Sequence, residues 1–487
     1  MALESNHGYT LTLVMKILIK GSYIEPDPSY RSICRSLSKL RYPLKIETDS
    51  LLVINSILMT YTISHLIYSP CSQSSYVYFL PHTITHLTLG RDFHRDDENI
   101  RNKDYEGSRI YFPKNLMELT IFWYNFYIEI SIDDKSKSSL PSTLTHLNLG
   151  KTFNREITIL PNLSHLILSH NFNKGLDHLP LTLKSLTISF YFDLNLDLRY
   201  LSNLTNLDMS SNRVFNRTLD YLPDSLMYLA TSSAFNQRID LLPPNLSHLI
   251  LGYSFNQRVD HLPVNLLHLT FGAKFNKPIE RLPPNLKTLT FDQIRNCDFS
   301  QAIFNNLPKS LIKLTMPSTY NYLFTASPNL KKLVLGHFFN RPINVVLNGI
   351  IMFPMGLTHL TFGSFFNKKI DFIPPYLLHL HLELGSFNRK VDHLPIGLLT
   401  LKLGHFFNQK INHLPLSLKS LEIGNLFNQR VDRLPHGLER LILGYGFNRR
   451  VDKLPTSLIY LSLPKVRKVN KNTRRVWKYE SVVYETK

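Results

Sequence analysis

The stretch LPPNLSHLILGYSFNQRVDHL, residues 242–262, is followed directly by LPVNLLHLTFGAKFNKPIERL, residues 262–282. The same pattern returns as LPIGLLTLKLGHFFNQKINHL at 394–414 and as LPLSLKSLEIGNLFNQRVDRL at 414–434. The consensus LPxxLxxLxLGxxFNxx(I/V)DxLP recurs with a commonest spacing of 20 residues. A fixed period of this length is typical of a solenoid, in which each repeat forms one rung of a stack.

The first half of each repeat is expected to form a short strand. In the first repeat quoted, this strand covers residues 246–251. Successive side chains of a strand point to opposite faces, so Leu249 and Leu251 should point into the interior. The intervening His248 and Ile250 should then face solvent.

The second half of the repeat returns the chain to the start of the next strand. Phe255 is bulky enough to fill the interior, and Val259 and Leu262 should return to the core. Asn256 is expected to cap the turn by bonding nearby backbone groups, a task that suits its short amide. The same structural roles are expected for the pairs Phe275-Asn276, Phe407-Asn408 and Phe427-Asn428.

Glycine and proline mark the two ends of the strand. Gly252 is expected to let the chain leave the strand sharply, because glycine tolerates backbone conformations that other residues avoid. Pro263 has a fixed φ and no N–H, so it should give an extended entry into the next strand.

One repeat cannot fold alone. Its buried side chains contribute roughly 1.5–3 kcal/mol each, which does not offset an ordering cost of roughly 1.5 kcal/mol for every residue. Stacking is therefore required, and it predicts a leucine-rich-repeat-like solenoid, mainly β with coil, whose strands form a curved parallel sheet. A repeat of 20 residues leaves no room for a full return helix. The regions left for helix are a short N-terminal region and the tail.

Three segments follow from the repeat pattern. Residues 1–75 form an N-terminal region, residues 80–463 the solenoid and residues 464–487 a basic tail. The tail includes KVRKVNKNTRRVWK, with seven Lys or Arg and no acidic residue, and is expected to leave the solenoid after Pro464. A solvated basic cap, a nuclear-import signal and a nucleic-acid arm are the alternatives.

Composition places the chain among globular proteins. Hydrophobic residues make up 43% and charged residues 19%, which is too apolar for a disordered chain. The 3 cysteines lie far apart without a CxxC pair, which indicates neither a disulfide framework nor a zinc site. A reducing, intracellular compartment is therefore favoured. The apolar residues 51–68 contain Asn, Ser, Thr and His, which favours a buried helix or a first rung over a membrane span.

The recurring Phe-Asn pair, followed by Ile or Val and then Leu-Pro, resembles the FNIP repeat family. The matching pairs begin at Phe153, Phe172, Phe215, Phe235, Phe255, Phe275, Phe339, Phe366, Phe387, Phe407, Phe427 and Phe447. The resemblance covers roughly residues 80–463. Such proteins occur in social amoebae and in giant DNA viruses of amoebae, so the resemblance implies one of those sources. For a viral protein it implies a location inside the host cell, in the cytoplasm or the nucleus.

Proteins of this family often carry an N-terminal F-box, the module that docks a substrate receptor onto a cullin-type ubiquitin ligase. Residues 29–40, SYRSICRSLSKL, resemble the end of an F-box, and TLTLVMKILI at 10–19 would be the preceding helix. The Leu-Pro opening of the module is absent. The two interpretations of residues 1–75 are an F-box-like region that binds a ubiquitin-ligase adaptor and a helical cap that shields the first rung.

Histidine recurs at one solvent-facing position of the expected strands. The residues are His86, His146, His165, His248, His268, His359 and His379. Stacking should bring His146 beside His165, His248 beside His268, and His359 beside His379, about 4.8 Å apart. Because no Asp, Glu or Cys was found to complete a set of ligands, a partner-binding surface is favoured over a metal site.

Threonine recurs at the other solvent-facing position. The residues are Thr88, Thr120, Thr187, Thr270, Thr290, Thr315 and Thr361. Histidine and threonine together supply hydrogen bonds without strong charge, and charging of the imidazoles could weaken binding in acid. We expect a protein partner to contact this concave face at His146, His165, His248, His268, Thr270, His359, Thr361 and His379.

Charge offers a second way to bind a partner. The formal net charge is +19, which favours acidic partners. A basic row follows Phe-Asn, from Arg217 to Arg449, and an acidic row follows it, from Asp177 to Asp452. The two rows are expected to line one edge and to pair between rungs. The alternative, a basic edge that grips the phosphates of nucleic acid, lacks the interleaved aromatic residues of single-strand binders.

Five segments depart from the repeat. They are residues 91–110, 122–139, 292–306, 317–327 and 343–353. Each is either a binding loop or an insertion that a surface loop tolerates. The charged and aromatic loops between 91 and 139 are expected to add specificity.

No motif in the chain indicates catalysis. A P-loop, a GxSxG elbow and an HExxH motif are absent, and the carboxylates sit at repeat positions. The sequence therefore predicts no catalytic residue, no cofactor and no metal. The predicted function is protein binding on the concave strand face. The alternatives are a cullin-ligase substrate receptor and a nucleic-acid binder.

Overall fold

The computed structural model describes most of the predicted repeat region. The described residues are 82–89, 111–121, 140–151, 153–157, 160–292, 304, 307–343, 353–382, 385–451 and 453–464, and the backbone of short strands at 13–16, 44–48, 65–68, 78–79, 110, 346–347, 350–351 and 481–485. The chain divides into two compact units, Met1–Ala234 and Phe235–Lys487.

The first unit is a stack of short strands that pair in chain order. The strands are β1 (Leu13–Lys16), β2 (Leu44–Thr48), β3 (His65–Tyr68), β5 (His86–Leu89), β7 (Glu118–Ile121), β8 (His146–Asn148), β9 (His165–Ile167), β10 (Ser185–Thr187), β11 (Asn206–Asp208) and β12 (Tyr228–Ala230). Every pairing in this series is parallel. A separate parallel pair joins β4 (Tyr78–Phe79) to β6 (Ile110–Tyr111).

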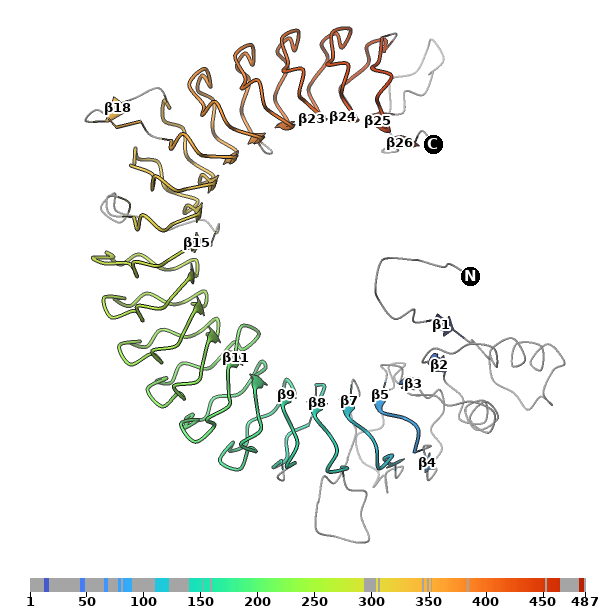
Figure 1. The fold of residues 1–487 in the computed structure, drawn as a ribbon, viewed down its shortest axis with the longest axis vertical. Helices are drawn as coiled ribbons and strands as arrows, with labels where there is room; N and C mark the ends of the chain where they lie inside the picture. The colour runs from blue at the N-terminus through green and yellow to red at the C-terminus, as the bar shows by residue number, and fades with distance from the viewer. Residues whose placement is uncertain are drawn as a thin grey trace, which may run out of the picture. The chain divides into compact units, whose positions relative to one another are not determined.

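The second unit repeats this architecture. Its strands are β13 (His248–Ile250), β14 (His268–Phe271), β15 (Thr288–Phe291), β16 (Lys313–Thr315), β17 (Lys332–Val334), β20 (His359–Phe362), β21 (His379–Leu382), β22 (Thr400–Leu403), β23 (Ser420–Ile423), β24 (Arg440–Leu443) and β25 (Tyr460–Pro464). These strands are parallel, and the small hairpin β18 (Val346–Leu347) and β19 (Ile350–Ile351) lies between β17 and β20 in the chain. Within each unit the strands lie along the inner edge of the curved stack (Figure 1).

The predicted fold class, a leucine-rich-repeat-like parallel solenoid, is confirmed in both units. No α-helix occurs in the part of the chain that the structure describes. The strands are shorter than expected, since the predicted strand at 246–251 is regular only over His248–Ile250. A short strand suffices because each rung is held by its two neighbours and needs few ladder bonds of its own.

The core positions of the repeat follow the prediction with one exception. Leu249, Leu251, Phe255 and Val259 are buried. Leu262 is only half-buried, because the adjacent Pro263 occupies the interior of that corner.

Proline begins a tight turn, so the prediction of an extended entry was wrong. The carbonyl of Pro243 accepts a hydrogen bond from the N–H of Leu246 at 3.1 Å, and Pro263 and Leu266 repeat this contact at 3.1 Å. A bond between residues i and i+3 defines a β-turn. The Leu-Pro-x-x-Leu motif is therefore the corner that turns the chain into the strand.

Glycine after the strand serves close packing between rungs. Of the described glycines only Gly150 has a positive φ, at 67°, so the predicted sharp exit at Gly252 does not require one. At Gly424, an added Cβ would lie 2.7 Å from the carbonyl oxygen of Gly404 in the preceding rung. Such an approach excludes any side chain, which explains the recurrence of glycine.

The Phe of most Phe-Asn pairs stacks on its equivalent in the next rung. In the second unit the ring centroids of Phe387, Phe407, Phe427 and Phe447 follow one another at 6.1 Å, with interplanar angles of 3° to 15°. Phe407 and Phe427 are fully buried. These residues lie in the interior, and the offset of the rings suits aromatic packing.

The Asn of most Phe-Asn pairs bonds the next rung. The Oδ1 atom of Asn256 accepts the backbone N–H of Asn276 at 2.9 Å, and Asn408 accepts that of Asn428 at 3.0 Å. In the first unit Asn154 accepts the N–H of Asn173 at 2.9 Å. These bonds form an asparagine ladder along each unit. The prediction of a structural role holds, but its partner lies about twenty residues away.

One predicted irregular segment is an ordinary rung. Residues 317–327 place Tyr320 where other rungs place phenylalanine, and the side chain is fully buried. Asn321 follows it and accepts the N–H of Asn340 at 3.0 Å. Tyr320 and Asn321 therefore form a variant Phe-Asn pair. The proposed loops at 91–109 and 122–139, and nearly all of 293–306, lie outside the described residues.

The N-terminal region contributes strands where the structure describes it. β1 covers residues 13–16, within the stretch expected to be the first F-box helix, and β3 lies in the apolar segment 51–68 as a rung. The rest of residues 1–75, including the motif at 29–40, lies outside the described residues. No helix in the described part of the chain is long and apolar enough to cross a membrane.

The end of the basic tail returns to the sheet. β26 (Ser481–Glu485) pairs antiparallel with β25, with Tyr460 opposite Glu485. The tail was expected to leave the solenoid, and at 481–485 it instead covers the last parallel strand. The motif at 465–478 lies outside the described residues.

Candidate partner-binding face

Two rows of side chains lie on the strand side of each unit. They are the first and third residues of strands β5, β7 to β17 and β20 to β25, and we call them the strand face. Most of them are half-buried or exposed, whereas Ala230, Thr315 and Ser462 are buried. The second residue of each strand points inward, as the burial of Leu249, Leu269 and Leu360 shows. The alternation follows from the two-residue period of a strand.

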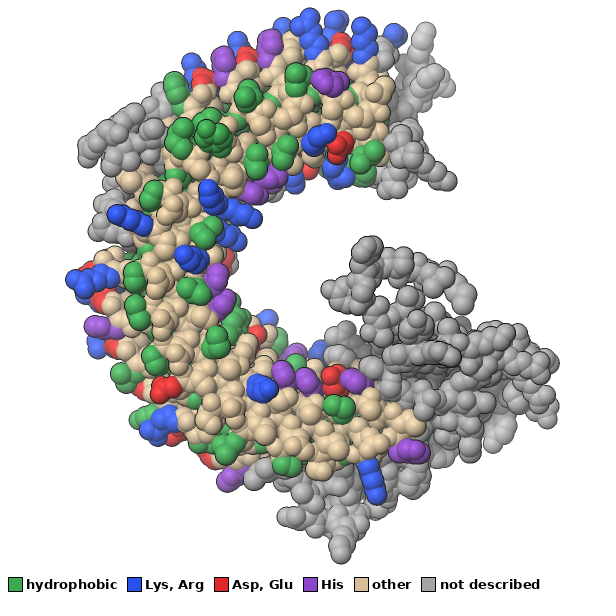
Figure 2. Space-filling model, in the orientation of Figure 1, with side chains coloured by type: hydrophobic (Ala, Val, Ile, Leu, Met, Phe, Trp, Pro, Cys, Tyr) green, Lys and Arg blue, Asp and Glu red, His purple; other side chains and the backbone are tan. Residues whose placement is uncertain are grey.

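Histidines gather in stacked pairs on this face. The rings of His146 and His165 have centroids 4.1 Å apart and an interplanar angle of 7°. In the second unit His248 stacks on His268 at 4.3 Å, and His359 on His379 at 4.2 Å. All three pairs predicted from the repeat are therefore in contact. Figure 2 shows histidine side chains gathered along the strand side of each unit.

A hydroxyl group before the histidine fixes several of these rings. The Thr145 hydroxyl donates to the carbonyl of Met117 at 3.0 Å, and its oxygen lies 2.9 Å from Nδ1 of His146. Because the hydroxyl proton is already used, Nδ1–H of the neutral ring donates and Nε2 is the acceptor nitrogen. Ser164 repeats this arrangement for His165 with distances of 3.0 and 2.8 Å.

The second unit uses the same device. Thr358 donates to the carbonyl of Lys331 at 3.0 Å and lies 2.9 Å from Nδ1 of His359. His379 instead lies 2.8 Å from the hydroxyl of Thr400 on the next strand. The rings are held in fixed orientations by neighbours, which makes them rigid polar groups on the strand face.

Burial lowers the pKa of several of these imidazoles. It does so for His165 and His268, where the stacked neighbour adds to the effect, and for His379, where Lys332 adds to it. For His359, burial, His379 and Lys332 lower the pKa to about 4. These rings are therefore uncharged at neutral pH.

Glu118 lies between two histidines of the first unit, and sequence reasoning missed it. Its Oε1 is 3.4 Å from Nε2 of His86 and 3.8 Å from Nδ1 of His146. Alignment of the repeats in register would have placed it in the histidine row. Even so, no group of three His, Cys, Asp or Glu among the described residues is arranged to hold a metal ion.

Threonine forms the second row of the strand face in the middle of the second unit. Thr270 pairs in register with Thr290, and Thr361 with His381. Thr270 and Thr361 are half-buried, whereas Thr315 is 9% exposed. The structure therefore places the candidate residues of each unit on one face of its sheet.

Several residues of the basic row are engaged within the solenoid. Arg341 Nε donates to the carbonyl of Asn321 at 2.8 Å, and Arg389 Nε donates to that of Asn367 at 3.1 Å. Arg258 reaches Glu280 of the next rung at 3.6 Å. Pairing with acids occurs as predicted, but bonds to the preceding asparagine carbonyl were not foreseen. Both kinds of contact reduce the number of basic side chains that this edge can offer to the phosphates of nucleic acid.

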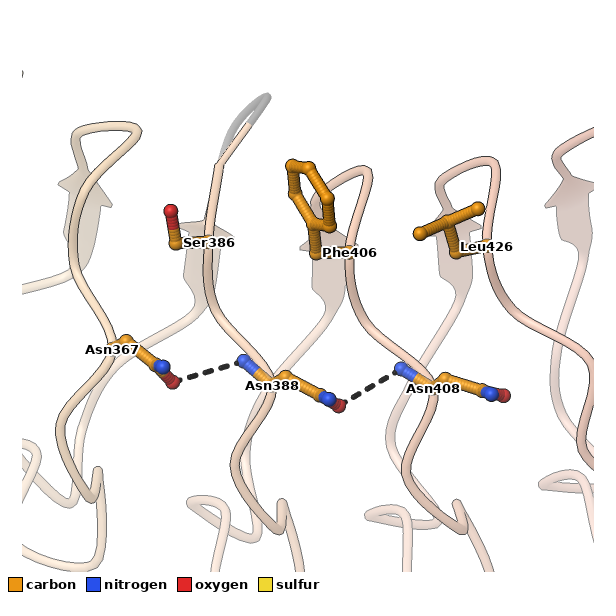
Figure 3. Close-up of a pocket in the computed structure, with 6 residues that line it drawn as sticks. All are labelled: Asn367, Ser386, Asn388, Phe406, Asn408 and Leu426. Atoms are coloured by element: carbon orange, nitrogen blue, oxygen red, sulfur yellow. Dashed lines mark hydrogen bonds between the residues drawn. The ribbon is translucent and has the colours of Figure 1, made fainter.

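A shallow pocket lies beside the asparagine ladder of the second unit. It is lined by Asn367, Ser386, Asn388, Phe406, Asn408 and Leu426. Figure 3 shows Phe406 and Leu426 beside one another above the ladder, in which Asn367 and Asn388 each accept the N–H of the following asparagine. The Asn388 and Asn408 side chains are thus engaged in the ladder and in bonds to the next rung.

Comparison with known proteins places this solenoid in a family. The FNIP Repeat model matches residues 215–254, 235–274, 255–293 and 348–387. The structure is similar to that of CroV588, a circular leucine-rich-repeat protein of a giant virus, with a TM-score of 0.61 and 31% identity over 88% of this chain and 66% of that protein.

A second similar structure is YopM from Yersinia enterocolitica. Its TM-score is 0.42, with 19% identity over 81% of this chain and 86% of that protein. No curated protein sequence matches. On the repeats matched and the likeness to CroV588, this chain is a member of the FNIP repeat family, folded as a leucine-rich-repeat-like solenoid.

Proposed function

We propose that this protein acts without catalysis, by binding a protein partner on the strand face. The observation that carries the proposal is the set of three stacked histidine pairs on the strand face. Hydroxyl groups hold His146, His165, His359 and His379 in fixed orientations. Rigid polar groups give specific contacts at a low entropic cost. The phenylalanine and asparagine rows, by contrast, bind rung to rung.

The contact residues proposed belong to both units. In the first unit they are His146 and His165. In the second they are His248, His268, Thr270, His359, Thr361 and His379. An imidazole in its neutral form and a threonine hydroxyl can each donate and accept hydrogen bonds, so this face suits the mixed polar and apolar surface of a protein.

Affinity capture with mass spectrometry tests the proposal. Thr270→Arg and Thr361→Arg each add a bulky charge to the strand face, and Ile396→Arg adds the same charge at an exposed turn away from it. The two threonine variants should lower recovery of the specific partners at least tenfold, because a charge left unpaired in an interface is costly. Circular dichroism checks that each variant is folded.

Other outcomes would contradict the proposal. Equal recovery by all variants, or loss only with Ile396→Arg, would place the interface elsewhere. Substitution is preferred to removal of residues 1–75, because β3 pairs with β5 and its loss would expose a sheet edge. Cullin-ligase components retained by every variant would instead favour a substrate receptor.

A further inference from the structure

Four lysines gather on one part of the second unit. Lys313 and Lys332 are the first residues of β16 and β17 and are neighbours in register on the strand face. Lys287 and Lys331 immediately precede the first residues of β15 and β17. All four are exposed, and we call them the lysine patch. Figure 2 shows basic side chains gathered along the strand side at this level.

The neighbours of the lysine patch among the described residues do not neutralise its charge. Lys313 has Thr288 as its other neighbour in register, and Lys332 has His359. Where the structure describes the chain, no ion pair joins any of the four lysines to an acid. Like charges side by side in a sheet are unfavourable. The charge of Lys332 also contributes to lowering the pKa of His359 and His379.

Lysines farther along the same sheet are neutralised. Lys402 on β22 lies 3.4 Å from Glu422 on the next strand. Lys419 immediately precedes β23, the same position as in Lys287 and Lys331, and lies 2.8 Å from Glu439 in the next rung. Lys402 is the third residue of its strand, so only Lys419 matches a position of the lysine patch. The sheet can therefore place an acid beside an exposed lysine, and among the described residues it does not do so in the lysine patch.

We propose that the lysine patch binds an acidic polypeptide segment, whose carboxylates take the place that Glu422 and Glu439 hold farther along the sheet. This inference rests on the proposed function and specifies the chemistry of the partner. Thr290 and Thr361 are half-buried in the adjacent row and bring hydroxyl groups near a bound peptide.

A polypeptide suits the patch better than nucleic acid. The first and third residues of β13 to β17 and β20 to β22 include no Phe, Tyr or Trp. Single-stranded nucleic acid is bound by stacking of its bases on such residues. The patch also uses lysine, a point charge that bonds single carboxylates, and not arginine.

Fluorescence anisotropy with a labelled poly-glutamate peptide tests the inference, at about 0.15 M ionic strength. The full chain is compared with Lys313→Gln/Lys332→Gln and with the matched control Lys402→Gln/Lys419→Gln, which removes the same charge. We expect the first pair of substitutions to weaken poly-glutamate binding roughly tenfold and the control pair to leave it nearly unchanged. An oligothymidylate of similar charge is titrated in parallel.

The outcomes separate this inference from the proposed function. Equal affinities for the two double variants, or no poly-glutamate binding by the full chain, would overturn the lysine patch as an acidic-peptide site. Tighter binding of oligothymidylate, lost with Lys313→Gln/Lys332→Gln, would assign the patch to nucleic acid and overturn it too. Partner recovery that still depends on Thr270 and Thr361 would leave the strand-face proposal standing.

A second measurement does not depend on the probe. Because Lys313 and Lys332 are neighbours of like charge, Lys313→Gln/Lys332→Gln should unfold at the same temperature or higher. Lys402→Gln/Lys419→Gln breaks two ion pairs and should not raise the unfolding temperature. A marked loss of stability in the first variant would mean that its lysines are already paired, which contradicts the inference.

Discussion

At the scale of the residue, a Ser/Thr-His dipeptide fixes the orientation of several histidine rings on the strand face. Thr145-His146, Ser164-His165 and Thr358-His359 each place a hydroxyl oxygen 2.8 to 2.9 Å from Nδ1. The hydroxyl donates its proton to a carbonyl of the preceding rung, so the tautomer of the neutral ring is set by backbone pairing. The Ser/Thr-His dipeptide is visible in the sequence, and it was the signal that could have predicted these fixed rings.

The titration of His359 gives the first prediction. Its pKa is lowered from 6.5 to about 4, and Lys332 is one of the causes. We expect the imidazole to titrate near that value in NMR spectra of the folded protein. Lys332→Gln should raise this pKa, because it removes a positive charge near the ring. An unchanged value in that variant would contradict the assigned cause.

The same shift predicts how stability depends on pH. The folded state holds fewer protons than the unfolded state between pH 6.5 and about 4. The contribution of His359 to the free energy of unfolding is therefore present above pH 6.5 and is lost as the pH falls through this window. Urea unfolding at pH 7 and pH 4 should show a smaller decline in His359→Asn than in the wild type.

The asparagine ladder gives a second prediction at this scale. Asn388→Ala removes the acceptor of the Asn408 N–H, a bond of 3.1 Å. The loss should cost roughly 0.5–1.5 kcal/mol and speed hydrogen exchange at the Asn408 amide. Asn412→Ala, an exposed residue outside the ladder, is the control and should leave that amide unchanged. Equal exchange in both variants would show that the ladder bond is not formed in solution.

At the scale of the element, each rung is held by what it stacks upon. The neighbouring residues Phe406 and Phe407 have different surroundings, since Phe406 is 51% exposed and Phe407 is fully buried. The ring of Phe407 lies 6.1 Å from both Phe387 and Phe427. Within this dipeptide, the first phenylalanine is thus exposed and the second is stacked in the interior.

These two phenylalanines make a matched test. Phe407→Ala should destabilise the protein by about 3–5 kcal/mol, because it opens a cavity between two stacked rings. Phe406→Ala should change stability by roughly 0.5 kcal/mol or less, as is usual for an exposed residue. Thermal unfolding monitored by circular dichroism compares them. Similar losses in the two variants would contradict the assignment of interior and surface.

At the scale of the whole molecule, a solenoid must protect the ends of its sheet. The open edge of a parallel strand offers unpaired N–H and C=O groups to other chains. β26 pairs with β25 over five residues, from Pro464 opposite Ser481 to Tyr460 opposite Glu485. This antiparallel strand completes the ladder where the repeats end.

Removal of β26 therefore has a predictable result. A chain that ends at residue 480 should keep its folded rungs but expose the outer edge of β25, and we expect concentration-dependent self-association. Analytical ultracentrifugation of both proteins over a range of concentrations measures it. A shortened chain with the same association state as the full chain would show that this edge needs no cover.

Much of the molecule followed from the repeat alone. A fixed period brings each residue beside its equivalent one repeat later, so the parallel sheet, the buried row that includes Phe255 and Phe407, and the three histidine pairs could be predicted. Only the tertiary structure determined the contacts that these neighbouring residues make with one another. The asparagine ladder, the closeness of Gly424 to Gly404 and the unneutralised lysine patch depend on side-chain direction and on distances between rungs. A periodic pattern specifies which residues meet, and only the packed rungs determine the geometry in which they meet.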